Sequence, residues 1–91
     1  MNIIFSEQAW EEYVYWQSVD PSAITKINNL LNAICQTPFE GFGRPEALTY
    51  GLKGFWSRWI TDEHQLVYRV YGDKGINQVC EVVQCRYHYK K

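Results

Sequence analysis

The first part of the chain shows hydrophobic positions with a helical period. Residues 1–5 are apolar and β-branched, which predicts a short strand, and Ser6 is a good N-cap for the segment that follows. Apolar side chains then recur at helical spacing, while glutamate and glutamine take the opposite face. These apolar positions are Ala9, Trp10, Tyr13, Val14 and Trp16. The pattern predicts a helix that begins after Ser6 and ends near Val19.

A second helix is predicted directly after the first. Asp20-Pro21 combines an N-cap acid with proline at the first helical position, where its missing N–H has no cost. One apolar stripe follows, made of Ile24, Ile27, Leu30, Leu31 and Ile34. Because the connection is short, we expect the two helices to be antiparallel neighbours.

The second half of the chain has the composition of a β-sheet. Residues 36–45 contain two prolines and two glycines, which predicts a loop that leads from the helices to this sheet. Valine, isoleucine, tyrosine and tryptophan are then frequent. The strands predicted from them span residues 55–61, 65–71 and 76–89, with turns at 62–64 and 72–75.

This order of elements predicts the fold class. One strand, two helices and an antiparallel meander give an α+β fold, with the helices packed on one face of a twisted, mainly antiparallel sheet. The other face of the sheet is then the candidate functional surface. At 91 residues, the chain is expected to form one domain.

Composition narrows the classes of function. Hydrophobic residues make up 46% of the chain and aromatic residues 16%, so we expect rings both in the core and facing a ligand. The formal net charge of -1 argues against a protein that binds polyanions through many phosphate contacts. Any binding of nucleic acid must therefore depend on a local cluster of cations.

Location and cofactors are also constrained. The chain contains no apolar run of about 18 residues and no export signal, which predicts a cytoplasmic protein without membrane contact. Its three cysteines, Cys35, Cys80 and Cys85, match no zinc motif in their spacing. We expect them to be reduced, buried thiols, and we expect neither a metal nor another cofactor.

Candidate chemistry is concentrated in the middle loop and at the C-terminal end. Arg86-Tyr87-His88-Tyr89 places a histidine between two tyrosines and beside an arginine, while Pro45-Glu46 places a carboxylate next to a proline far upstream. This combination indicates acid and base chemistry on an anionic substrate with faces that stack, which fits RNA.

Several ordered motifs carry a resemblance to a known family. They are Trp10, Tyr13-Val14-Tyr15-Trp16-Gln17, Thr37-Pro38-Phe39-Glu40-Gly41, Pro45-Glu46, Gly54-Phe55-Trp56-Ser57-Arg58, Glu63-His64, Leu66-Val67-Tyr68 and Arg86-Tyr87-His88-Tyr89. With them the chain resembles the YoeB/Txe toxins of the RelE/ParE superfamily, ribosome-dependent mRNA endonucleases (mRNA interferases) of toxin–antitoxin modules. The resemblance covers nearly the whole sequence and implies a RelE-like microbial RNase fold.

The resemblance also implies roles for individual residues. RNA would be cleaved without metal by attack of a 2′-hydroxyl, with Glu46 as the base and His88 as the acid that protonates the leaving oxygen. Tyr89 would position or stack a base. Without the resemblance, Glu46 would be an ordinary loop carboxylate and His88 an ordinary terminal residue. His64, in a turn, is expected to have a capping or structural role.

Two positions depart from the family pattern. Gln65 stands where the family has an arginine after Glu-His, and Trp59 stands where a second arginine commonly follows Ser-Arg. Glutamine donates neutral hydrogen bonds and cannot offset charge on a phosphorane, so we expect an attenuated nuclease with Gln65 in the catalytic site. Trp59 is compatible with stacking on a base or with packing at a dimer or antitoxin interface.

Other cations are candidates for contact with RNA. The expected RNA-binding residues are Arg44, Arg58, Trp59, Arg86 and Lys90, with Lys91 as a further cation. Arg69 lies on the same strand face as Gln65 but roughly 13 Å along it, too far to replace the arginine. Arg86 and Lys90 share the face of His88 and are the better candidates for compensation.

A second hypothesis belongs to a different class of function. The chain would be a catalytically impaired toxin homologue that binds an antitoxin and acts as a co-repressor. The glutamine at position 65 is compatible with two origins. The arginine was lost naturally, or it was replaced deliberately so that a toxin could be expressed safely. The hairpin over residues 72–83 is longer than the family implies, and no function is assigned to it.

The expected partners follow from the resemblance. They are a cognate YefM/Axe-like antitoxin, whose disordered acidic segment would fold over the site, and the ribosome with its mRNA. DNA would be contacted only through the antitoxin. A homodimer is compatible with the number of aromatic residues.

Overall fold

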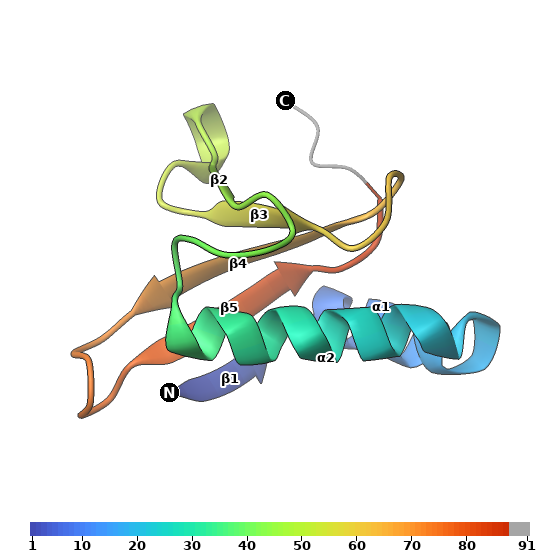
Figure 1. The fold of residues 1–91 in the computed structure, drawn as a ribbon, viewed down its shortest axis with the longest axis horizontal. Helices are drawn as coiled ribbons and strands as arrows, with labels where there is room; N and C mark the ends of the chain where they lie inside the picture. Colours follow the sequence, from blue (N-terminus) through green and yellow to red (C-terminus); the bar gives the residue numbers. More distant parts are fainter. Residues whose placement is uncertain (88–91) are drawn as a thin grey trace.

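The computed structural model describes residues 1–87 and contains two helices and a five-stranded sheet. The elements are β1 (Asn2–Phe5), α1 (Glu7–Val19), α2 (Pro21–Gln36), β2 (Glu46–Ala47), the 3-10 turn η1 (Tyr50–Leu52), β3 (Trp56–Trp59), β4 (Gln65–Tyr71) and β5 (Val79–Gln84). Figure 1 shows α1 and α2 on one side of the strands, with β2 and β3 at the far end of the sheet from β1.

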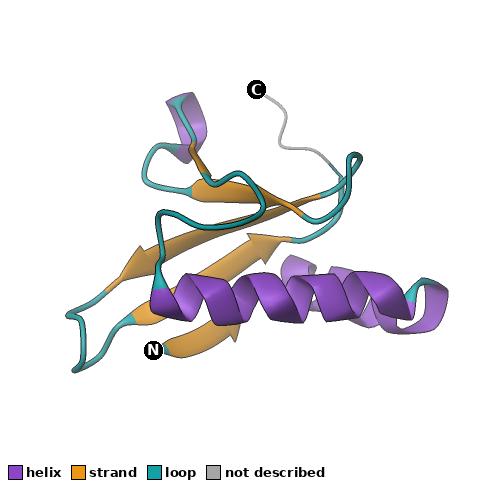
Figure 2. Ribbon diagram, in the orientation of Figure 1, coloured by secondary structure: helices purple, strands orange, loops and turns teal. Residues whose placement is uncertain are grey.

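The sheet has the strand order β1-β5-β4-β3-β2. Only the pairing of β1 with β5 is parallel, and the other three pairings are antiparallel. Figure 2 shows the helical layer against the strand layer. The predicted fold class is therefore confirmed, with the helices on one face of a mainly antiparallel sheet.

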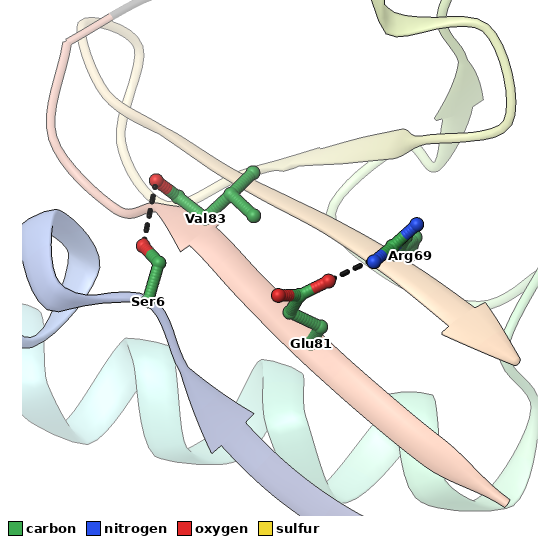
Figure 3. A network of polar contacts seen from close by, with 4 residues as sticks. All are labelled: Ser6, Arg69, Glu81 and Val83. Carbon is green, nitrogen blue, oxygen red and sulfur yellow. Dashed lines mark hydrogen bonds and ion pairs between the residues drawn. The ribbon is translucent and has the colours of Figure 1, made fainter.

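Local capping explains where both helices begin. The Ser6 hydroxyl accepts a hydrogen bond from the backbone N–H of Ala9 at 3.1 Å, which caps α1 as predicted. The Asp20 carboxylate accepts from the N–H of Ser22 at 3.1 Å, and Pro21 takes the first position of α2. The Ser6 hydroxyl also donates to the Val83 carbonyl at 3.5 Å, which joins the start of α1 to β5 (Figure 3).

The core lies between the helices and the inner face of the sheet. The residues buried there include Ala9 and Trp16 of α1, Ile27, Leu30 and Ile34 of α2, and Leu66, Tyr68, Cys80 and Val82 of the sheet. The predicted α2 stripe is confirmed, since Ile27, Leu30, Leu31 and Ile34 are buried and Ile24 is partly buried against the core. In α1, however, Trp10 and Val14 are 51% and 42% exposed, so the predicted apolar face is only partly buried.

The last strand ends earlier than predicted. Val67 pairs with Gln84 and Tyr68 pairs with Val82, so Val83 is an extra residue in a β-bulge. β5 then stops at Gln84, and Tyr87 has a left-handed φ of 67° and is 55% exposed. The predicted strand over residues 76–89 is therefore wrong in its bounds, because the bulge and this turn break the alternation.

The cysteines are not all buried. Cys80 and Cys85 are buried, and burial raises the pKa of each thiol to about 12. Cys35, near the end of α2, is exposed, so the expectation of a buried thiol is wrong there. Within residues 1–87, no helix is both long and apolar enough to span a bilayer.

Candidate active site

The outer face of the sheet, which is the face turned away from both helices, carries three of the candidate residues, namely Glu46, Trp59 and Gln65. Side chains alternate along a strand, and Arg58, Leu66 and Tyr68 are buried toward the helices. Their neighbours Ser57 and Gln65 therefore face outward. Trp59 pairs with Gln65 and belongs to the same face.

Glu46 reaches the outer face because it belongs to a short strand that the sequence did not reveal. It pairs with Ser57 in the antiparallel β2–β3 ladder, and its side chain is exposed. Glu46 and Gln65 are separated by two strand spacings across the sheet and by two residues along β3, from Ser57 to Trp59. This places their backbone positions roughly 12 Å apart. Side chains of this length can converge on one nucleotide from the two positions.

Arg58 is buried and makes no contact with solvent. Its relative exposure is 0%, so the prediction that it binds RNA is wrong. The guanidinium donates to the Tyr68 hydroxyl and the Phe42 carbonyl at 3.1 Å each, and to the carbonyls of Thr37 and Glu40 at 2.8 Å each. Arg58 is buried because it occupies a position of β3 whose side chain points toward the inner face of the sheet. The loop between α2 and β2 supplies three carbonyl acceptors for its guanidinium.

The role of Arg58 is to hold the loop that leads to Glu46. Tyr68 completes this network, since its hydroxyl donates to the Pro38 carbonyl at 2.7 Å. Burial raises the pKa of Tyr68, and the hydrogen bond from Arg58 opposes that shift. At the loop's end the N–H of Trp59 donates to the Gly43 carbonyl at 2.7 Å, which fixes the approach to β2.

Gln65 lies where the sequence places it, on the outer face, and is 7% exposed. Its side-chain amide donates to the Ser57 hydroxyl at 3.5 Å. Its backbone N–H donates to the carbonyl of Tyr87 at 2.9 Å, so the C-terminal segment runs beside this position. The contact between Ser57 and position 65 was not predicted, because it depends on the strand register that the turn between β3 and β4 sets.

Two of the predicted RNA-binding residues form a cation–π pair. The Arg44 guanidinium lies 5.3 Å from the centre of a Trp59 ring, and Arg44 is exposed at the edge of the outer face. Such a cation on an aromatic ring offers both charge and a flat surface. Stacking on a base and packing at an interface both remain compatible with this geometry.

Arg86 is anchored to α1. Its guanidinium lies 3.7 Å from the ring centre of Tyr15 and 4.6 Å from that of Tyr87. Arg69 is also engaged, through an ion pair with Glu81 at 2.5 Å (Figure 3). Arg69 therefore does not replace the missing arginine at position 65, in agreement with the distance along β4.

The remaining predicted site residues, His88, Tyr89 and Lys90, lie outside the described residues. Lys91 lies outside them as well. Among residues 1–87, no three His, Cys, Asp or Glu side chains are grouped so that they could hold a metal ion.

Comparison with known proteins assigns the family. Residues 5–89 match the model of the YoeB-like toxin of bacterial type II toxin–antitoxin systems. The chain belongs to this family. Toxin YoeB of Escherichia coli K12 is 48% identical over 89 residues, which cover 98% of this chain and 100% of that protein. The matched range of the YoeB family includes Glu46, Gln65 and His88.

Solved structures of the YoeB family agree with the fold. A YoeB/ParE toxin from Agrobacterium tumefaciens superposes with a TM-score of 0.92 at 44% identity and covers 98% of this chain and 100% of its own. The YoeB chain of a heterotetrameric YoeB–YefM toxin–antitoxin complex from Staphylococcus aureus gives a TM-score of 0.85 at 43% identity, over 98% of each chain. The predicted resemblance to YoeB toxins is confirmed.

Proposed function

We propose that this YoeB-family toxin is a ribosome-dependent mRNA endonuclease with reduced activity. It would cleave mRNA in the ribosome by attack of a 2′-hydroxyl on the adjacent phosphate and so inhibit translation. The 2′-oxygen bonds to phosphorus, the bond to the leaving 5′-oxygen breaks, and the products are a 2′,3′-cyclic phosphate and a 5′-hydroxyl.

One observation carries this proposal. Glu46 and Gln65 share the outer face of the sheet, and the backbone of Tyr87 is hydrogen-bonded to Gln65. The carboxylate on the same face as Gln65, with the segment before His88 running beside Gln65, supports the proposal. Cleavage by proton transfer requires a base and an acid that both reach the same phosphate group.

Each residue has a stated task in the proposed reaction. Glu46 takes the proton of the attacking 2′-hydroxyl, and His88 gives a proton to the leaving 5′-oxygen. Arg44 and Trp59 hold the RNA through charge and stacking. Gln65 donates a neutral hydrogen bond where an arginine would offset negative charge, and this is why the rate is reduced.

The proposed partner that restrains the toxin is a YefM-like antitoxin. A YoeB chain 43% identical to this one is part of a YoeB–YefM complex. An acidic segment of the antitoxin would be attracted to Arg44 and would cover Glu46. A second candidate function, an antitoxin-binding co-repressor without catalysis, is favoured by the neutral side chain at position 65.

Cleavage of mRNA during translation tests the proposal. Wild-type protein added to a translating extract is expected to release mRNA fragments with 2′,3′-cyclic phosphate ends, mapped by primer extension. His88→Ala should lower this cleavage by about 10²-fold or more, because a positioned acid contributes about 10²- to 10⁴-fold. Intact mRNA with wild-type protein that still binds a YefM-type antitoxin would instead support the second candidate.

A further inference from the structure

The backbone of Tyr87 adopts a conformation that a bulky residue rarely takes. Its φ of 67° lies in the left-handed region, which is unfavourable for a residue other than glycine. Such a conformation persists only where neighbouring groups hold it. Residue 87 is also the last described residue before His88, so its φ and ψ set the direction in which the chain continues.

Both polar backbone groups of Tyr87 are held by consecutive residues, His64 just before β4 and Gln65 at its first position. Its N–H donates to Nδ1 of His64 at 2.7 Å, and its carbonyl accepts from the N–H of Gln65 at 2.9 Å. The side chain of Gln84 adds a third support, since its amide donates to the carbonyls of Arg86 at 2.9 Å and Tyr87 at 3.2 Å.

His64 is itself fixed by its surroundings. The backbone N–H of His64 donates to the Thr61 hydroxyl at 3.2 Å. The His64 ring meets the Trp16 ring edge-on, with 4.8 Å between the ring centres. The indole N–H of Trp16 donates to the Cys85 carbonyl at 2.8 Å. Trp16 thus contacts both His64 and the segment that His64 binds.

The acceptor role of His64 defines its chemical state. Nδ1 accepts the Tyr87 N–H, so we assign the ring hydrogen to Nε2. Toward Tyr87 the His64 ring therefore acts as a neutral hydrogen-bond acceptor, and not as a cation or a proton donor. Asparagine places its side-chain oxygen at nearly the same distance from the backbone as Nδ1, whereas leucine offers a similar volume without an acceptor.

We propose that His64 is a positioning residue for RNA cleavage, because it fixes the left-handed turn at Tyr87, the residue that directly precedes His88 in the sequence. This inference rests on the proposed endonuclease function. A misplacement of about 1 Å at a catalytic group can lower a rate by about 10²-fold, so the effect should appear in the chemical step.

Two variants in a Gln65→Arg parent separate positioning from a general structural role. His64→Leu is expected to lower kcat on programmed ribosomes by about 10- to 100-fold with KM little changed, because the RNA-binding residues remain in place. His64→Asn should recover most of that loss. Asp62→Asn, at an exposed position of the same turn, is the matched control and should cleave like the parent.

A spectroscopic measurement makes the result independent of catalysis. With ¹⁵N labelling, a coupling across the N–H···N hydrogen bond should link the Tyr87 amide nitrogen to Nδ1 of His64. The inference is overturned if this coupling is absent, if His64→Leu cleaves like the parent, or if His64→Asn loses as much as His64→Leu at equal thermal stability. If the Gln65→Arg parent does not cleave mRNA, the proposed function and the effect of His64 on cleavage are both overturned. The coupling still decides whether His64 holds the Tyr87 N–H.

Discussion

Replacing Gln65 by arginine is expected to raise the rate of mRNA cleavage on the ribosome by about 10²- to 10³-fold, the range attributed to one preorganised donor at developing charge. Gln65 already lies on the outer face with Glu46 and beside Tyr87. A guanidinium at this position adds a positive charge and two parallel N–H groups that match phosphate oxygens. The rate is measured by primer extension on ribosomes programmed with one mRNA.

Two control substitutions separate charge from shape. Gln65→Leu removes the hydrogen bond to Ser57 without adding charge and should give no increase. Gln65→Lys adds the charge without the planar fork and should give a smaller increase than arginine. An increase with leucine equal to that with arginine would show that Gln65 reduces the rate for a reason other than its missing charge.

Replacing Arg58 by methionine is expected to lower the free energy of unfolding by about 3 kcal/mol or more. Hydrogen bonds to a charged group contribute about 1.5–3 kcal/mol each, and Arg58 donates four, although water can reach some of the freed loop carbonyls. This change is a large part of the stability of a small domain, about 5–15 kcal/mol. Urea denaturation followed by tryptophan fluorescence measures it.

Arg69→Met is the matched control for this prediction. The same substitution there breaks an exposed ion pair with Glu81, in which the Arg69 side chain is 46% exposed. Such pairs contribute about 1 kcal/mol or less, so Arg69→Met should be close to wild type. Equal losses for the two variants would contradict the structural role assigned to Arg58.

Elements defined by neighbouring residues were predicted well from the sequence. Ser6 and Asp20 cap the two helices through bonds to residues two or three positions away, so their starts are local properties. The bounds of β4, Gln65–Tyr71, also match the prediction. A strand buried in the middle of the sheet has a clear β composition, and its ends are marked by turn residues.

Features that depend on distant contacts were missed. β2 has two residues and exists only because Glu46 and Ala47 pair with β3. The bulge at Val83 depends on how β5 meets β4. Arg58 was predicted as one of the local cations for RNA, and its burial was missed because the carbonyl groups that satisfy it come from a loop 16 to 21 residues away in sequence.

In the candidate site, too, individual residues were predicted and contacts between distant segments were missed. Family resemblance indicated Glu46 and Gln65, and the structure places both on one face. The contact between Arg44 and Trp59 and the bond from Tyr87 to His64 were not predicted, because each joins segments that meet only in the folded chain. One sequence signal could have predicted the burial of Arg58. Side chains alternate along a strand, so an outward Trp59 implies an inward Arg58.

The central claim, that Glu46 on the outer face is the base of an RNA-cleaving site, is tested most directly by comparing Gln65→Arg with Gln65→Arg/Glu46→Gln. Cleavage of one mRNA on programmed ribosomes is measured under single-turnover conditions. The account predicts strong cleavage by the single variant and a loss of about 10²-fold or more in the double variant. Equal cleavage by the two proteins would contradict it.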